Sequence, residues 1–136
     1  MASAGYSGTP IAKKLGVGPE KRFDLIDDQI GLTDILAEQQ PEAIHAAGEK
    51  DLDVLVTFCT TSAGVLEGLA RATDRVVTNG SWWISWPKKS SKLPSEITEQ
   101  DLRDLLLHRT PWVDVKVCAV DENWSGLKFV RRLSER

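Results

Sequence analysis

The sequence has few of the side chains from which metal centres and disulfide frameworks are built. It contains two cysteines and two histidines in 136 residues, and none of the four is close to another. A tetrahedral zinc site needs ligands at recognised spacings, so the sequence predicts no metal site. Cys59 and Cys118 lie in apolar runs, where a reduced cysteine behaves as a small hydrophobic residue. We therefore expect both thiols to be structural.

Long hydrophobic runs and an excess of positive charge are also missing. No apolar run approaches the roughly 18 residues that a membrane span needs. Residues 1–10 have neither the charged lead nor the apolar core of a secretory signal. Seventeen Lys and Arg against twenty Asp and Glu give a net charge of -3, which disfavours electrostatic wrapping of nucleic acid. These absences predict a cytoplasmic protein with neither a membrane nor a nucleic-acid partner.

Catalytic motifs are absent as well. The sequence has no Gly-x-Ser-x-Gly elbow, no P-loop and no His-Glu-x-x-His pair. Asp27 and Asp28 could form an acid/base or metal pair, but adjacent acids after a strand are more typical of a helix start. His108, near a predicted helix end, suits the helix dipole. We assign no catalytic residue, and the sequence favours a protein that is not an enzyme.

The composition that is present is that of one globular domain. Hydrophobic residues make up 41% and charged residues 27%, and the length suits a single α/β domain over residues 1–136. Charge is distributed unevenly, because residues 23–53 carry nine acids against Lys50 alone. We interpret that acidic stretch as a solvated helical face.

The first half of the sequence predicts alternating helices and strands. Residues 1–20 form an N-terminal segment with a short helix at 11–15, which Thr9 caps and Pro10 opens. Strands are predicted at 22–27 and 52–60, with a helix over 30–39 between them. Residues 41–48 fit either a short edge strand or a helical turn.

The second half continues the alternation. A helix begins at Ser62 as its cap and ends at a left-handed Asn79-Gly80 stop, and a strand covers 81–86. Thr98 and Asp101 form a capping box for a helix that runs to His108. A hairpin follows over residues 112–133, with its turn at 121–126. The pattern predicts an open, mostly parallel α/β sheet flanked by helices, with a C-terminal antiparallel β-hairpin that supplies a reversed edge strand.

Five tryptophans are many for this length. Strand alternation places Trp82 and Trp86 on one face and Trp83 on the other, which suits residues of a core. Trp112 opens the hairpin and is predicted to pack beneath the last helix. Only Trp124 is predicted to lie in a turn, at the rim where a ligand would bind.

Several loops converge on the carboxyl ends of the parallel strands, which is where open α/β sheets bind ligands. The ammonium groups of Lys88 and Lys89, beside hydroxyl donors, suit a phosphate, a carboxylate or a nucleotide tail. The ring of Trp124 could stack on a base, and residues 5–9 could fold over the site. An ordinary exposed loop explains the lysines and serines more simply, and Trp124 fits a structural cover of the hairpin end as well as it fits a stacking role. The candidate ligand-binding residues are Lys88, Lys89, Ser90, Ser91, Trp124, Ser125, Tyr6, Ser7 and Thr9.

Three segments, in order, carry a resemblance to a known family. They are the GYSGTP run at 5–10 with AKKLG at 12–16, the SWPKKS run at 85–90, and VKVCAVDENWSGLK at 115–128. Together they resemble the uncharacterised bacterial family called domain of unknown function 3052, over nearly the whole chain. The resemblance implies a shortened, methyltransferase-like Rossmann architecture and assigns no activity.

The sequence departs from an active methyltransferase at the turn after the first strand. Domains that bind S-adenosylmethionine in this architecture need a glycine-rich turn there and an acid at the end of the second strand. This chain instead has Asp27-Asp28-Gln29-Ile30-Gly31, and its weak second strand is followed by no acid before Glu49. We therefore expect no cofactor.

Two functions fit these observations. The first is a non-catalytic module that binds a small anionic or nucleotide-like ligand at the strand carboxyl rim. The second is a protein-interaction or regulatory module that docks a partner or a second copy through a Trp-rich surface. A degenerate methyltransferase fits less well.

Overall fold

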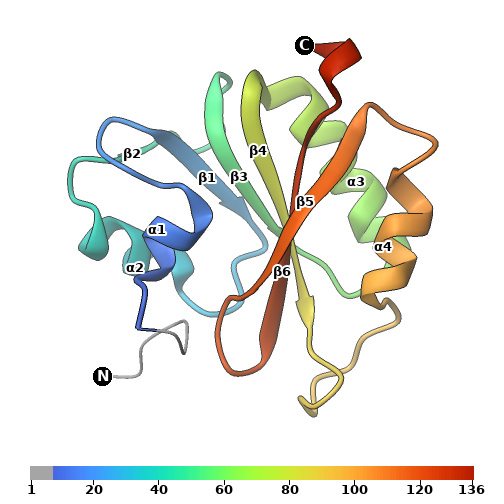
Figure 1. The fold of residues 1–136 in the computed structure, drawn as a ribbon. Coiled ribbons are helices and arrows are strands. Elements are labelled where there is room, and N and C mark those ends of the chain that lie inside the picture. The colour runs from blue at the N-terminus through green and yellow to red at the C-terminus, as the bar shows by residue number, and fades with distance from the viewer. Residues whose placement is uncertain (1–7) are drawn as a thin grey trace.

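Six strands form a single sheet in the computed structural model, which describes residues 8–136 (Figure 1). The order across the sheet is β2-β1-β3-β4-β6-β5. β1 to β4 pair in parallel, whereas β6 runs antiparallel to both of its neighbours. The strands are β1 (Arg22–Ile26), β2 (Ile44–His45), β3 (Leu52–Phe58), β4 (Val76–Pro87), β5 (Trp112–Ala119) and β6 (Trp124–Arg131).

The predicted α/β fold with its C-terminal antiparallel hairpin is confirmed, with one correction. The reversed strand β6 lies between β4 and β5 rather than at the edge. Leu127 and Phe129 of β6 are fully buried, whereas Val115 and Val117 of β5 are about half exposed, at 52% and 46%. The more apolar strand of the hairpin therefore takes the interior position, because it buries more hydrophobic surface there.

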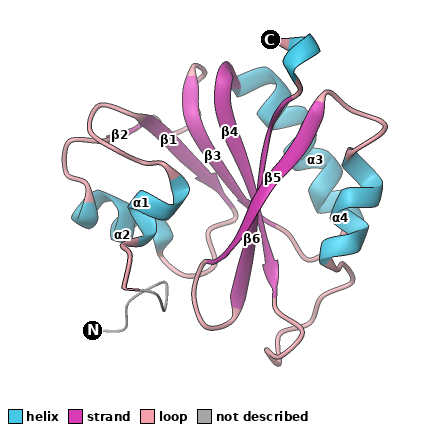
Figure 2. Cartoon of the chain, viewed as in Figure 1, coloured by secondary structure: helices cyan, strands magenta, loops and turns pink. Residues whose placement is uncertain are grey.

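Helices cover the two faces of the sheet in pairs (Figure 2). α1 (Ile11–Leu15) and α2 (Leu32–Gln39) pack on one face in a core that includes Phe23, Val54 and Trp83. α3 (Ser62–Arg75) and α4 (Glu99–Leu106) pack on the other face in a second core. A 3-10 turn, η1 (Leu133–Glu135), follows the last strand. No helix between residues 8 and 136 is long and apolar enough to cross a membrane.

All five tryptophans are buried in these two cores. Trp82 and Trp86 lie in the α3/α4 core and Trp83 in the α1/α2 core, as strand alternation predicted. Trp112 also lies in the α3/α4 core, where its indole N–H donates to the Thr73 hydroxyl of α3, and Trp124 is only 6% exposed. The prediction of a Trp-rich docking surface is therefore wrong, because all five rings are buried in the two cores.

Helix starts were predicted with mixed success. The capping box of α4 is present, with Thr98 Oγ1 accepting from the Asp101 N–H at 3.2 Å and the Asp101 carboxylate accepting from the Thr98 N–H at 2.9 Å. The cap of α3 is Thr61 rather than Ser62, and it accepts from the Gly64 N–H. At α1 the N-cap is Pro10 and no side chain caps the helix, so Thr9 does not have its predicted role.

The predicted Asn79-Gly80 stop is also wrong. α3 ends at Arg75 and β4 begins at once, so both residues belong to the strand. The pairing of β3 with β4 is irregular there, since Leu52 pairs with Val76 but Val54 pairs with Ser81. A Cβ on Gly80 would lie 3.0 Å from the backbone oxygen of Asp53. This glycine is needed for a close approach of two strands and not for a left-handed turn.

Candidate functional site

The parallel strands end along one rim, and the chain reverses direction across the sheet between β1 and β3. β1 connects outward to β2, whereas β3 connects to β4 on the other side. Ligands of open α/β sheets bind at such a reversal, outside the carboxyl ends of the strands. The residues there are Asp27 and Asp28 after β1, and Cys59 to Thr61 before α3.

The carboxylate of Asp28 already fills the anion position at the start of α2. It accepts hydrogen bonds from the N–H groups of Ile30, Leu32 and Thr33 and from the Thr33 hydroxyl, at 2.9 to 3.1 Å. Burial by itself would raise the pKa of Asp28, but these hydrogen bonds hold it below the ordinary value of 3.8. The helix donors that could bind a phosphate or a carboxylate are thus satisfied by the chain itself.

β2 is too short to contribute to this rim. Its two residues pair with Arg22 and Phe23, at the start of β1. Glu49, the first acid after β2, forms an ion pair of 2.7 Å with Arg22, at the opposite end of β1 from the rim. An acid placed to bind ribose hydroxyls is therefore missing from the described rim. With the self-filled turn at Asp28, these residues do not fit S-adenosylmethionine in the usual Rossmann manner.

The chain uses a buried ion pair to hold the short β2–β3 connection. Asp24 of β1 binds Arg75 at the end of α3 at 2.5 Å, and both residues are 7% exposed. Asp24 also accepts from the Gly48 N–H and contacts His45, while Arg75 donates to the Glu49 carbonyl oxygen. Burial would raise the pKa of Asp24, but Arg75 and the other hydrogen bonds hold it below 3.8. These charges therefore hold the β2–β3 connection against β1 and the end of α3.

The thiol and hydroxyl groups on the rim also serve the fold. Burial raises the pKa of Cys59 to about 11, so the thiolate that a nucleophile requires is scarce at neutral pH. Thr61 caps α3, and the carbonyl oxygen of Thr60 accepts from the Glu96 N–H, which ties the loop after β4 to this end of the sheet. Among residues 8–136 no three His, Cys, Asp or Glu side chains gather as metal ligands.

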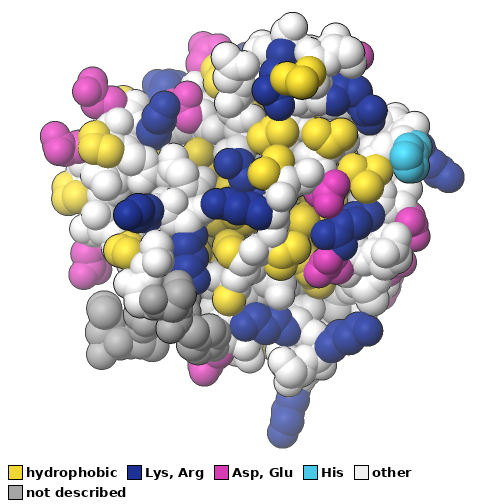
Figure 3. Space-filling model, viewed as in Figure 1, with side chains coloured by type: hydrophobic (Ala, Val, Ile, Leu, Met, Phe, Trp, Pro, Cys, Tyr) yellow, Lys and Arg dark blue, Asp and Glu magenta, His cyan; other side chains and the backbone are white. Residues whose placement is uncertain are grey.

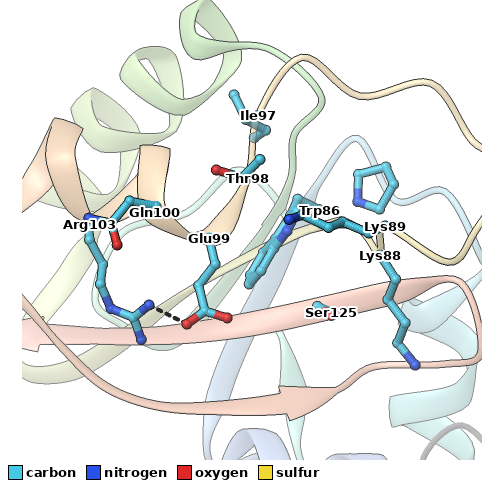
Figure 4. Close-up of a pocket in the computed structure, with 10 residues that line it drawn as sticks. Trp86, Lys88, Lys89, Ile97, Thr98, Glu99, Gln100, Arg103 and Ser125 are labelled. Carbon is cyan, nitrogen blue, oxygen red and sulfur yellow. Dashed lines mark hydrogen bonds and ion pairs between the residues drawn. The ribbon is translucent and has the colours of Figure 1, made fainter.

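A cavity of about 420 Å³ lies further along the rim, between the end of β4, the start of α4 and β6 (Figure 4). From α4, Arg103 and Glu99 line one side and are joined by an ion pair. Trp86 and the two lysines after β4 line the other side, and the Lys88 chain extends away from Arg103. The lining residues are Trp86, Pro87, Lys88, Lys89, Ile97, Thr98, Glu99, Gln100, Arg103 and Ser125.

Arg103 is held by two acids. Besides Glu99, its Nε atom donates to Asp114 of β5 at 3.0 Å. The hydrogen bonds to Glu99 and Asp114 raise the pKa of Arg103 above its ordinary value. Because both acids already compensate this guanidinium, it forms a fixed wall of the cavity rather than an open anion site.

The structure brings together some of the predicted binding residues and separates others. Lys88, Lys89 and Ser125 line the cavity, whereas Ser90 is exposed on the adjoining loop. The Ser91 hydroxyl donates to the Lys88 carbonyl oxygen at 2.8 Å and so closes the loop. Thr9 is not among the cavity residues, and the predictions for Tyr6 and Ser7 lie outside the described residues.

The stacking role predicted for Trp124 is contradicted by its position. The residue opens β6 instead of lying in the turn, and its ring packs edge-on against Phe58 with 5.0 Å between centroids. This contact belongs to the α1/α2 core, on the other side of the sheet from Trp86. Trp86 is the ring that borders the cavity.

Sequence reasoning missed the α4 side of the cavity. The capping box had located the start of α4, and Glu99 and Arg103 are spaced as an i,i+4 ion pair. What the sequence could not supply was the distance between α4 and the end of β4, since nine residues separate Lys88 from Thr98 in the chain.

Comparisons with known proteins identify the class of fold. No protein-family model matches the chain, and no curated protein matches it. The likeness to domain of unknown function 3052 thus stays a resemblance. Solved structures do match, at low sequence identity. The chain has a methyltransferase-like α/β fold.

Three of the similar structures illustrate the match. The pyocyanin biosynthetic protein PhzM aligns with a TM-score of 0.66 and 12% identity over 89% of this chain and 53% of that one. A putative type 11 methyltransferase from Sulfolobus solfataricus gives 0.58 and 14% over 98% and 96%. Fibrillarin from Aeropyrum pernix, with natively bound S-adenosyl-L-methionine, gives 0.57 and 12% over 88% and 73%. The chain spans about half the length of PhzM, and identities this low establish the fold alone.

Proposed function

We propose that this chain is a non-catalytic protein of methyltransferase-like fold that binds a small anionic or nucleotide-like ligand in the rim cavity beside Lys88 and Lys89. The observation that supports the proposal is the meeting of cationic, hydroxyl and apolar side chains around one cavity of about 420 Å³. Ligand pockets for small molecules span roughly 300 to 1,000 Å³.

The chemistry of the lining supports an anion with an apolar or aromatic body. Lys89 is exposed at the cavity, and among residues 8–136 it takes part in no ion pair. Trp86 and Ile97 offer apolar contact, and the hydroxyls of Thr98 and Ser125 offer hydrogen bonds. A carboxylate or phosphate near the lysines, with a ring against Trp86, would use all three kinds of contact.

The self-filled turn at Asp28 argues against a methyltransferase. A ligand of the S-adenosyl class would need the α2 donors that Asp28 occupies and a ribose-binding acid that β2 does not deliver to the rim. We therefore separate the proposed cavity from the cofactor position of the fold, and the experiment distinguishes the two.

The test is calorimetric titration of the purified chain with ADP, with S-adenosylhomocysteine and with benzoate, each up to millimolar concentration. We expect ADP or benzoate to bind, and the double variant Lys88→Glu/Lys89→Glu to abolish that binding. Lys92→Glu, on the same loop but outside the cavity lining, is the matched control and should bind like the parent.

Two results would overturn the proposal. One is the absence of binding by all three probes at millimolar concentration. The other is binding that the double variant leaves unchanged, above all if S-adenosylhomocysteine is the probe that binds, because the ligand would then occupy the cofactor position of the fold.

A further inference from the structure

The sheet face that carries α1 and α2 is only partly covered. These helices pack against β1, β3 and Trp83 of β4, and in Figure 1 they lie to the side of β5 and β6. On this face the start of β6 is buried, because Trp124 packs in the α1/α2 core, whereas Lys116 of β5 is exposed and Lys128 of β6 is half-buried. The opposite face, beneath α3 and α4, buries Trp112, Leu127 and Phe129 of the same two strands.

Two lysines of the hairpin and one of the neighbouring helix α1 lie here, and we name Lys14, Lys116 and Lys128 the lysine face. Lys116 and Lys128 are directly opposed across β5 and β6. Partial burial and the charge of Lys116 both lower the pKa of Lys128. Lys14 and Lys116 both act on Cys118, whose pKa burial raises and their charges lower. Like charges placed directly opposite on a sheet are destabilising, so the isolated chain carries an uncompensated repulsion here.

A second repulsion of opposite sign lies on α2. Asp34 and Glu38 are exposed and four residues apart on this helix, and Glu42 is exposed shortly after its end. We name these three the α2 carboxylates. Like charges at this helical spacing are also destabilising. Neither the α2 carboxylates nor the lysine face takes part in any ion pair found among residues 8–136.

The two charged groups lie on the same side of the sheet. Figure 3 shows basic side chains over the centre of this side and acidic ones toward its left margin, beside α2 and β2. Asp34, Glu38 and Glu42 belong to the acidic stretch of residues 23–53 that was interpreted from sequence as a solvated face. When two patches of opposite charge lie on one side of a molecule, a two-fold axis can pair them. The acidic patch of each copy then meets the basic patch of the other.

A nucleic acid is the other polyanion that the lysine face could attract. Nucleic-acid surfaces of this kind add exposed aromatic rings on which bases stack. Among residues 8–136 every Phe and Trp is buried, with 6% the highest exposed fraction. The lysine face thus has no exposed ring of Phe or Trp beside it, which favours carboxylates of a protein surface as the counter-charge.

We propose that two copies of this chain associate, with the α2 carboxylates of one copy seated on the lysine face of the other. Each contact replaces two internal repulsions with attractions between copies. The interaction is electrostatic and exposed, so it is weak and weakens further as salt is added. It does not depend on ligand binding in the rim cavity.

Charge reversal in both patches tests the proposal by sedimentation velocity at low salt, over micromolar to millimolar protein. The parent chain should dimerise. Lys116→Glu/Lys128→Glu and Asp34→Lys/Glu38→Lys should each weaken dimerisation by about tenfold or more when measured alone. Mixing the two variants in equal amounts should restore a dimer, because the reversed patches complement each other.

Controls separate this contact from folding and from the proposed ligand site. Lys89→Glu/Lys92→Glu makes the same change in net charge on the rim loop and should dimerise like the parent. Lys14→Glu/Lys116→Glu provides a second lysine-face variant that leaves β6 unchanged. Circular dichroism should show that all variants keep the fold.

Three outcomes would overturn the proposal. The parent could stay monomeric at millimolar concentration and low salt, or the mixed variants could fail to associate. The third is that a fluorescent oligodeoxythymidylate binds the parent and not Lys116→Glu/Lys128→Glu, which would identify the face as a nucleic-acid surface.

Discussion

The carboxylates near β1 and the lysines after β4 are both charged groups beside a sheet, yet the chain uses them in opposite ways. Asp24 and Asp28 are surrounded by donors from the chain itself, including Arg75 and the start of α2. Lys88 and Lys89 border a cavity instead. Asp24 thus serves the fold within β1 and Asp28 fills its part of the rim, whereas Lys88 and Lys89 line a space that no side chain fills.

The same difference separates the rim cavity from the position at which Rossmann-like folds usually hold a cofactor. A short β2 and a carboxylate that caps α2 close the usual position from within. The loop between β4 and α4 opens another position, with Trp86 as its apolar wall. Site and fold are separable, because a site depends on a few side chains at the ends of the strands.

The largest expected effect comes from breaking the buried ion pair of β1. Arg75→Met should lower the free energy of unfolding by about 3 to 5 kcal/mol, because it leaves the Asp24 carboxylate buried without its partner. Urea unfolding measures the loss. Arg71→Met, which removes an exposed i,i+4 partner of Glu67, is the control and should cost under about 1 kcal/mol. Equal losses in the two variants would show that Asp24 is not held as a buried charge.

Removing the carboxylate that fills the α2 position should cost less. We expect Asp28→Ala to lower the free energy of unfolding by about 1 to 2 kcal/mol, in the range of helix N-cap losses. Glu38→Ala, exposed on the same helix, should change it by less than about 0.5 kcal/mol. If Asp28→Ala proved neutral in urea unfolding, the α2 donors would not depend on Asp28.

The free energy of unfolding should also fall in acid, because Asp24 and Asp28 become protonated there. The pKa values of Asp24 and Asp28 in the folded chain lie below 3.8, their value when unfolded. Their contribution is complete above 3.8 and is lost as the pH falls through the lower folded values. Urea unfolding from neutral pH to about pH 2 measures this loss. Asp28→Asn should flatten the curve, and an unchanged curve would contradict the assignment.

The smallest effect on stability is expected at the rim cavity. Lys88→Glu/Lys89→Glu should change the free energy of unfolding by no more than about 0.5 kcal/mol, as is usual for surface substitutions. If the double variant lost as much free energy of unfolding as Asp28→Ala, the contrast between the carboxylates and the lysines would be wrong, because these lysines would also stabilise the fold. Thermal and urea unfolding of the double variant give the answer directly.

Local signals predicted much of the fold. The apolar run of β3, the capping box of α4 and the alternation of Trp82, Trp83 and Trp86 each depend on neighbours in the chain, and each was found as predicted. The failures came where two distant segments meet. Gly80 suggested a helix stop, but a glycine is needed there because the backbone of β3 approaches it closely. Trp124 was predicted to be an exposed ring, but it packs against Phe58 in the core.

The candidate site divides in the same way. The cluster at residues 88–91 marked a loop that borders the cavity, and Ser125, predicted on the same rim from the hairpin, also lines it. Glu99 and Arg103 entered the cavity only because α4 folds back beside β4, and the 3.0 Å bond from Arg103 to Asp114 of β5 helps to hold it there. No spacing in the chain encodes that contact.

By itself the sequence determined the fold class, the hairpin, the start of α4 and the absence of familiar catalytic motifs, since these depend on periodicity and on residues a few positions apart. The tertiary structure alone decided that β6 lies inside the sheet, that every tryptophan is buried and that Asp28 fills the α2 position. It also decided where an open cavity forms. Such outcomes depend on which surfaces bury the most apolar area and which charges find partners, and both are settled only when distant segments meet.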